Sequence, residues 1–346
     1  MRQEKIHCPI VGPKAWLGSD FANDTSWQYR LSPDEIAEID AALEANRQFV
    51  GNPTAMERSQ FILPELSKTL LRLNRELEDG RGFALIRGLP VDKWTLDEAR
   101  LVYWGLALFL GRMIVQDNKG KWIHDVYDAG ASFDNIKVRG YSTNAQLTPH
   151  CDSGDLVTLL CYRPAKAGGL NTIASFHTIY NKILAEHPEY LEPLFRGFHY
   201  NIRGGGPEGT PYENVTKHRV PVFSITDGLL SGRYNQKAIL TSAEYPGIAP
   251  FSDLERAAIN SVAEYALMDD ARFDLMLKAG DLLLLNNNDV MHTRSSFTDS
   301  DEPDKMRWLL RLWIVTPIGR PLPDNFADHY NTGPREGPAV REKIDA

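Results

Sequence analysis

The sequence predicts a mainly β protein in which a jelly-roll-like double sheet is flanked by helices. Three observations favour this fold class. Strand-like apolar segments recur after about residue 138, helical periodicity dominates before it, and strands do not alternate with helices as they do in a doubly wound sheet. The strand-like segments are residues 155–162, 171–175, 282–285 and 307–315.

The region before residue 138 is expected to be an arm followed by helices. The first 30 residues are rich in Pro, Gly and aromatic side chains, and we expect them to pack on the body of the protein. Ser32, followed by Pro33 and then Glu35, has the pattern of a helix start with a capping box. Further helices are predicted at about 65–78 and 95–110, with a short buried strand at 82–88 between them.

A chain of 346 residues is long enough for one large domain or for two of about 150 residues. We predict a single domain over residues 1–346. Its parts are an N-terminal arm and mostly helical flank (1–137), a jelly-roll core with a helical insert (138–320) and a C-terminal tail (321–346). The insert is expected to contain helical stretches at about 177–196 and 251–270.

The composition excludes several classes of protein. With 38 Lys and Arg against 46 Asp and Glu, the formal net charge is −8, which argues against a nucleic-acid partner because phosphates need a basic surface. No apolar run approaches the ~20 residues of a membrane span. The three cysteines, Cys8, Cys151 and Cys161, form no C-x-x-C pair, so we expect a reduced, cytoplasmic protein without a disulfide framework.

The histidines carry the first indication of chemistry. A non-haem iron(II) site uses two neutral imidazoles and one carboxylate, and an H-x-D/E triplet supplies two of these because residues i and i+2 of a strand face the same side. His187-Pro188-Glu189 interrupts a helical pattern and is expected at the surface. His150-Cys151-Asp152 precedes a strand, although His150 alone is equally well explained as a core or loop histidine. His292 follows the polar run at 286–289, expected to be a turn, and is the candidate third ligand.

The last predicted strand, residues 307–315, has two distinct faces. Alternation puts Trp308, Leu310, Leu312 and Ile314 on one apolar face and Arg307, Leu309, Arg311 and Trp313 on the other. The two arginines either face solvent or point into a cavity. In a cavity they need anionic partners, and a carboxylate ligand held by the guanidinium fork is the natural one.

Together these features resemble the TauD/TfdA family of iron(II)- and 2-oxoglutarate-dependent dioxygenases. The resemblance covers most of the chain: the H-x-D triplet, the Gly168-Gly169 turn, His292 with Arg294 and Phe297, and the R-x-x-x-R strand. It implies a double-stranded β-helix (jelly-roll) core, with Fe(II) as the metal and 2-oxoglutarate and O₂ as cosubstrates.

The resemblance also implies roles for individual residues. His150, Asp152 and His292 would be the catalytic metal ligands, and Arg307 would clamp the distal carboxylate of 2-oxoglutarate. Either Asn171 or Thr172 would be the polar partner of that carboxylate after the glycine turn. Arg311 matches a position that faces an anionic group of the primary substrate in several relatives.

The expected reaction is oxidation of an unactivated C–H bond, with succinate and CO₂ released. Hydroxylation, desaturation and cyclisation all remain open, and retention of Asp152 argues against halogenation. The substrate is expected to be a small amino acid or carboxylate, anionic or zwitterionic. Other candidate substrate-binding residues are Asn144, Gln146, Arg233 and Tyr234.

Two other functions fit part of the pattern. A zinc hydrolase would use the same two histidines and aspartate to activate water, but leaves the paired arginines unexplained. A jelly-roll binding module without a metal is the second alternative. A homodimer is compatible with the sequence.

Overall fold

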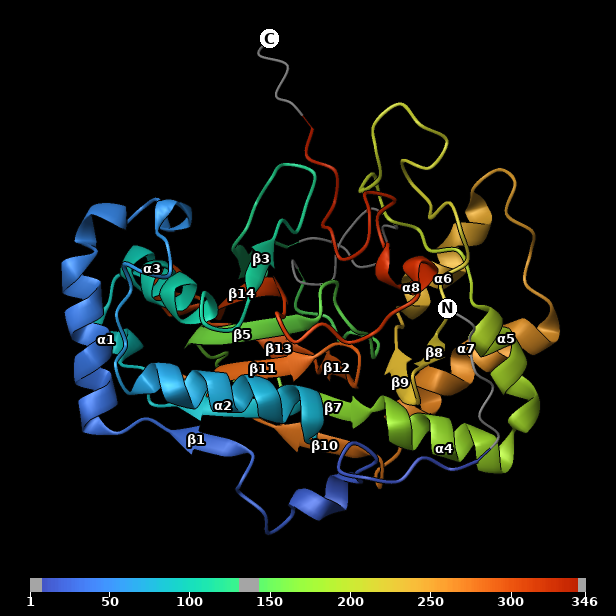
Figure 1. Cartoon of the computed structure of the whole chain (residues 1–346), viewed down its shortest axis with the longest axis horizontal. Helices are drawn as coiled ribbons and strands as arrows, with labels where there is room; N and C mark the ends of the chain where they lie inside the picture. Colours follow the sequence, from blue (N-terminus) through green and yellow to red (C-terminus); the bar gives the residue numbers. More distant parts are fainter. Residues whose placement is uncertain (1–7, 131–142, 342–346) are drawn as a thin grey trace.

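The computed structural model describes residues 8–130 and 143–341. Its centre is a seven-stranded sheet with the order β1-β2-β11-β5-β14-β3, in which β4 also pairs with β14 (Figure 1). The strands of this sheet are β1 (Gln28–Arg30), β2 (Phe83–Arg87), β3 (Arg112–Ile114), β4 (His124–Val126), β5 (Leu156–Arg163), β11 (Leu282–Asn286) and β14 (Trp308–Val315). All pairs are antiparallel except β1–β2.

A second, three-stranded sheet has the order β10-β7-β12 and is antiparallel throughout. Two further strand pairs, β6 with β13 and β8 with β9, extend the β structure around it. These strands are β6 (Ala167–Gly168), β7 (Asn171–Ser175), β8 (Phe223–Thr226), β9 (Leu229–Gly232), β10 (Arg272–Leu275), β12 (Val290–Arg294) and β13 (Phe297–Thr298). The second sheet matters for function because β12 carries His292.

The helices form two groups, visible in Figure 1 as the blue to teal helices beside the large sheet and the green to orange helices at the other end of the molecule. The first group is α1 (Pro33–Ala45), α2 (Leu66–Asp79) and α3 (Leu96–Ala107). The second is α4 (Phe176–Glu186), α5 (Leu191–Arg196), α6 (Gln236–Leu240) and α7 (Asp253–Ala266), and α8 (Asp324–Ala327) follows near the C-terminus. Short 3-10 helices occur at Gly18–Phe21, Arg47–Phe49, Pro53–Ala55, Val91–Lys93, Pro188–Tyr190, Thr241–Glu244 and Pro303–Lys305.

The two faces of the large sheet belong to two different hydrophobic clusters. Leu310, Leu312 and Ile314 of β14 pack in one cluster with α1, α2 and α3. Leu309 and Trp313 of the same strand belong to the other cluster, which also includes the smaller sheet and α4, α5 and α7. The alternation expected in this strand is therefore confirmed, and its polar face points toward the interior between the sheets.

Local signals locate the helix boundaries well. The Ser32 hydroxyl accepts a hydrogen bond from the Glu35 amide and the Glu35 carboxylate accepts one from the Ser32 amide, the capping box expected from sequence. The stretch predicted as helical at 177–196 is divided into α4 and α5. The division falls at His187-Pro188, because proline cannot donate the backbone hydrogen bond that would continue α4.

The part before residue 138 is less purely helical than expected. It supplies β1, β2, β3 and β4 to the large sheet, whereas only the strand at 82–88 was predicted. Three-residue strands are too short to show alternation, so tertiary pairing decides them. The expected packing of the N-terminal arm is confirmed for its described part: Trp16 and Trp27 are buried and contact the Phe83 ring.

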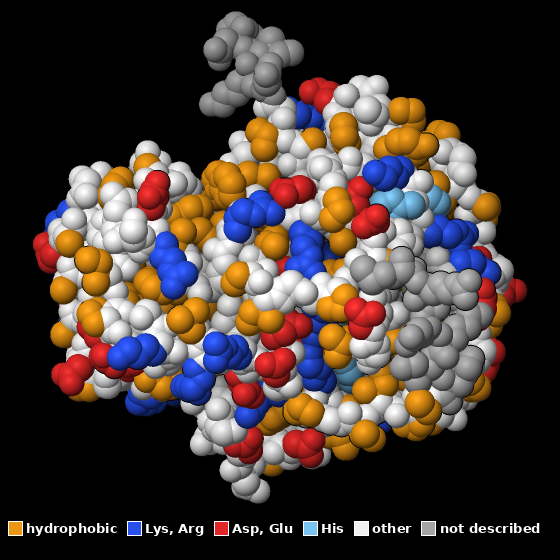
Figure 2. Space-filling model, in the orientation of Figure 1, with side chains coloured by type: hydrophobic (Ala, Val, Ile, Leu, Met, Phe, Trp, Pro, Cys, Tyr) orange, Lys and Arg blue, Asp and Glu red, His pale blue; other side chains and the backbone are white. Residues whose placement is uncertain are grey.

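Two surface properties bear on the class of protein. Every helix among residues 8–130 and 143–341 is too short or too polar to span a bilayer. On the face seen in Figure 2, acidic and basic side chains are interspersed and do not separate into broad areas of one sign.

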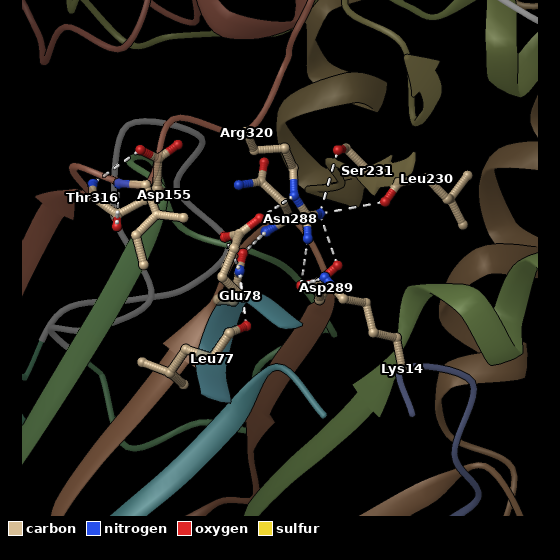
Figure 3. Close-up of polar contacts among 12 residues, drawn as sticks. Lys14, Leu77, Glu78, Asp155, Leu230, Ser231, Asn288, Asp289, Thr316 and Arg320 are labelled. Atoms are coloured by element: carbon tan, nitrogen blue, oxygen red, sulfur yellow. Dashed lines mark hydrogen bonds and ion pairs between the residues drawn. The ribbon is translucent and has the colours of Figure 1, made fainter. Parts of the chain in front are cut away.

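A buried ionic network links four segments that are distant in the sequence (Figure 3). The guanidinium of Arg320, just after β14, donates to Glu78 at the end of α2 at 2.7 Å and to both oxygens of Asp289 at 2.8 Å. Lys14 of the N-terminal arm donates to the same Asp289 carboxylate at 2.8 Å. Because Asp289 directly precedes β12, this network fixes the start of the strand that carries His292.

We expect Arg320→Leu to lower the free energy of unfolding by about 3–5 kcal/mol, because it leaves the Glu78 and Asp289 carboxylates buried without this partner. The measurement is urea denaturation followed by circular dichroism. Arg112→Leu is the matched control, since Arg112 pairs with Glu336 in solvent, and it should cost less than about 1 kcal/mol. Equal losses in the two variants would contradict a structural role for the network.

Candidate active site

Backbone pairing brings His150 and His292 together. The two residues form an isolated antiparallel bridge, in which the His150 amide donates to the His292 carbonyl at 3.0 Å and the His292 amide donates to the His150 carbonyl at 2.8 Å. Residues paired in this way project their side chains to the same side. Accordingly, the two imidazole ring centroids are 4.6 Å apart.

Asp152 lies beside this pair of rings. Its carboxylate Oδ2 is 3.8 Å from His292 Nε2, and both carboxylate oxygens accept from Arg311 Nη1 at 3.1 Å. The backbone amide of Asp152 donates to the side-chain carbonyl of Asn287 at 3.2 Å. The structure thus places the three predicted ligands, His150, Asp152 and His292, around one point.

The surroundings of the three groups favour the protonation states that a divalent metal needs. Burial lowers the pKa of His150, and burial together with the neighbouring His150 lowers the pKa of His292 to about 3. Burial alone would raise the pKa of Asp152, but the Arg311 charge, together with smaller contributions from His292, His150 and Trp313, outweighs burial and holds that pKa below its usual value. At neutral pH the site therefore offers two neutral imidazoles and one carboxylate.

The available donor atoms fit an iron(II) site. His150 Nδ1 is 2.8 Å from the Thr148 carbonyl; as an N–H donor there, it leaves Nε2 with its lone pair for a metal. His292 Nδ1 is buried with no hydrogen-bond partner among the described residues, and its Nε2 faces Asp152. Within that described part, no three His, Cys, Asp or Glu side chains are positioned to hold a metal ion as they stand, and the Asp152 carboxylate is bonded to Arg311.

A cavity of about 1280 Å³, including the part open to solvent, surrounds these groups. Arg307 lines it and is only 4% exposed, yet no carboxylate among the described residues pairs with it. Its guanidinium lies 5.0 Å from the centre of the Phe297 ring, and burial lowers its pKa. The nearby Asp299 carboxylate offsets only part of the cost of burying this charge, and no ion pair with a described residue satisfies the guanidinium, so this end of the cavity is suited to an anionic ligand.

Asn171 and Thr172, the two candidates for the second polar contact to the 2-oxoglutarate carboxylate, lie in different places in the structure. Asn171 is buried and lines the cavity beside Arg307. Thr172 is outside the cavity lining, and its hydroxyl donates to Asp274 on the adjacent strand β10. Successive residues of β7 face opposite sides, so only one of the two can reach the ligand.

Arg311 lies in the cavity as predicted, and its contact with a substrate anion stays a prediction. Its Nη1 is bonded to Asp152, and its Nε donates to the Gln116 side chain at 2.8 Å. The guanidinium therefore holds the ligand carboxylate through Nη1 and Gln116 through Nε, in addition to any contact with a substrate anion.

The other predicted substrate residues divide into two groups. Arg233 is 6% exposed and lines the cavity, as predicted. Tyr234 borders the cavity too, but its hydroxyl donates to the Ile259 carbonyl in the core, so it is structural. The side chains of Asn144 and Gln146 are exposed and lie outside the cavity lining, contrary to expectation.

Several site residues were missed from the sequence. Asn287 orients Asp152, and Gln116 orients Arg311. The run at 286–289 does form a turn, but its amides also bond across the fold, which no local pattern reveals. The C-terminal segment adds His329 and Tyr330 to the cavity wall, although it was predicted only as a tail.

Fold and site together define a non-haem iron oxygenase. The family model for the taurine catabolism dioxygenase TauD, TfdA family matches residues 47–313. The chain therefore belongs to the TauD/TfdA family of Fe(II)- and 2-oxoglutarate-dependent dioxygenases, with iron(II) as its metal and 2-oxoglutarate as its cosubstrate.

Individual relatives agree with this assignment. FR-33289 synthase of Streptomyces rubellomurinus (strain ATCC 31215) is 31% identical over 330 residues, 94% of this chain and 96% of the relative. Taurine hydroxylase-like protein SAT17 of Stachybotrys chartarum is 28% identical over 308 residues, 86% of this chain and 77% of the relative. Among solved structures, an asparagine oxygenase in complex with Fe(II), 2S,3S-3-hydroxyasparagine and succinate has a TM-score of 0.62 at 16% identity, covering 84% of this chain and 94% of that one.

Proposed function

We propose that this enzyme oxidises an unactivated C–H bond of a small anionic or zwitterionic substrate, an amino acid or a carboxylate, by hydroxylation or by oxidative desaturation or cyclisation. Succinate and CO₂ are the coproducts. The single observation that carries the proposal is the placement of His150, Asp152 and His292 in one cavity with the buried Arg307, whose guanidinium forms no ion pair with a described residue. The similarity to an asparagine oxygenase supports an amino-acid-sized substrate.

Each residue has a distinct task in this proposal. His150, Asp152 and His292 hold Fe(II), which when bound couples the oxidation of 2-oxoglutarate by O₂ to the oxidation of the substrate. Arg307 binds the distal carboxylate of 2-oxoglutarate through charge-assisted hydrogen bonds. Arg311 and Asn287 orient Asp152. The arrangement of the two sheets around this cavity also supports the double-stranded β-helix as the finer description of the fold.

Asn171 is the better candidate for the second contact to 2-oxoglutarate. We expect Asn171→Ala to raise the KM for 2-oxoglutarate about 10- to 150-fold, the cost of one hydrogen bond to a charged group. Thr172→Ala is the matched control on the next residue of β7, and it should leave this KM within about 2-fold. The reverse ranking would assign the contact to Thr172.

The test of the proposed function is anaerobic reconstitution with Fe(II), followed by exposure to O₂ with 2-oxoglutarate and a panel of small amino and carboxylic acids. Succinate release is measured, and the substrate product is identified by mass spectrometry. Stimulation by one member of the panel is the expected result. Turnover with Zn(II) but none with Fe(II), 2-oxoglutarate and O₂ would overturn the proposal in favour of a hydrolase.

A further inference from the structure

Arg233 is a further buried cation in the cavity, and the proposed reaction does not yet use it. It follows β9, and its guanidinium lies 5.1 Å from the centre of the Phe326 ring. Its Nε is buried without a hydrogen-bond partner among the described residues, and the Asp155 carboxylate interacts with its charge without forming an ion pair. Burying such a group is unfavourable unless a ligand provides the missing partner.

The backbone around Arg233 is joined directly to the metal-ligand segment. The amide of Cys151, between ligands His150 and Asp152, donates to the carbonyl of Tyr234 at 2.9 Å. The Tyr200 hydroxyl, also part of the cavity wall, donates to the carbonyl of Arg233 itself at 3.0 Å. The position of Arg233 is therefore fixed relative to the metal ligands.

Residues of β14, and Arg307 just before it, line the cavity one after another along the strand direction. Arg307 precedes the strand, Arg311 bonds Asp152 near its middle, and Trp313 follows, so the metal ligands lie between Arg307 and Trp313. At about 3.3 Å per residue, Arg307 and Trp313 are roughly 20 Å apart. With 2-oxoglutarate anchored at Arg307, the space near Trp313 is left for the primary substrate.

The C-terminal segment forms a wall of the cavity near Trp313. Tyr330 stacks on Trp313 at 6.4 Å between ring centroids, and its hydroxyl accepts from Ser153 at 3.1 Å. His329 packs edge-on against Tyr200 at 5.6 Å. Phe326, which supports Arg233, belongs to the same segment, and all three residues lie beyond the family-matched range 47–313.

We propose that Arg233, supported by Phe326, binds an oxyanion of the primary substrate in a subsite walled by Trp313, His329 and Tyr330. The ligand class is a small molecule with a carboxylate, sulfonate or phosphonate terminus, because the guanidinium fork matches paired oxyanion oxygens. This inference rests on the proposed function and names a substrate contact separate from the one expected of Arg311.

The test is anaerobic calorimetry on the Fe(II) enzyme saturated with 2-oxoglutarate, so that Arg307 is already engaged. Butyrate, 1-propanesulfonate and propylphosphonate are the probes, and propan-1-ol is the neutral reference. At least one anionic probe should bind more tightly than the alcohol, and Arg233→Gln should weaken that probe about 10- to 100-fold. The matched control Arg75→Gln, on the exposed face of α2, should leave the probe affinity unchanged.

Two more variants keep the test decisive if Arg233→Gln does not fold. Arg233→Lys retains the charge without the fork and should lose less affinity than the glutamine variant, and Phe326→Leu should weaken the probe about 3- to 10-fold. Wild-type probe affinity in these variants, or no preference for any anion over the alcohol, would overturn the inference. The 2-oxoglutarate affinity, titrated beforehand, separates the two hypotheses, because its absence in the wild type would contradict the proposed function itself.

Discussion

His292→Ala should abolish iron binding and turnover. The substitution removes one of two nitrogen donors, and the partner ring of His150, 4.6 Å away, cannot hold the metal with Asp152 alone. Iron affinity should fall at least about 100-fold, beyond the usual cost of losing a group that merely orients a ligand. Iron content after gel filtration and succinate release under saturating 2-oxoglutarate measure the two effects.

His187→Ala is the matched control for this prediction. His187 belongs to the second histidine–acid triplet of the chain, but its side chain is 46% exposed and lies 3.1 Å from Glu189 at the surface. This variant should keep its iron and its turnover. Iron retention by His292→Ala at the wild-type level would show that the metal is held elsewhere.

Arg307→Gln should chiefly weaken the binding of 2-oxoglutarate. The variant leaves the distal carboxylate of the cosubstrate in a buried site without its charged partner, which costs about 2–4 kcal/mol, or roughly 30- to 700-fold in Kd. Iron binding should persist because Arg307 contacts none of the three ligands. The measurement is titration of 2-oxoglutarate into the Fe(II) enzyme without O₂.

The control for Arg307 is Arg256→Gln, which removes an arginine from the exposed face of α7. Its 2-oxoglutarate affinity should equal that of the wild type. A loss of iron in Arg307→Gln comparable to the loss in His292→Ala would contradict the separate roles of the two residues.

Much of the fold was predictable because its signals are local. The capping box at Ser32 and the two-faced pattern from Trp308 to Ile314 both depend on near neighbours in sequence, and both are confirmed. The short strands β3 and β4 were missed, since three residues are stabilised by their neighbours in the sheet and carry no periodicity of their own.

The site was predictable to a similar extent. The structure brings together His150, Asp152, His292 and Arg307, which the sequence singled out through motif spacing and alternation. The bond between Arg311 and Asp152 was not predictable, because it joins residues that are 159 positions apart in the sequence. Asn144 and Gln146 were chosen for their closeness in sequence to His150, and that closeness did not place their side chains in the cavity.

The C-terminal segment has a practical consequence for work on this enzyme. Arg335 is bonded to the buried Asp155, and the amide of Ala339 donates to the carbonyl of Gly205, so the segment is fastened along its length up to a few residues from the end of the chain. A recombinant version that ended at residue 313, the boundary of the family match, would lack one wall of the cavity but keep the three predicted metal ligands. Such a protein would also lack Arg320 and with it the network that fixes the start of β12, so the C-terminal segment should be kept in any recombinant version.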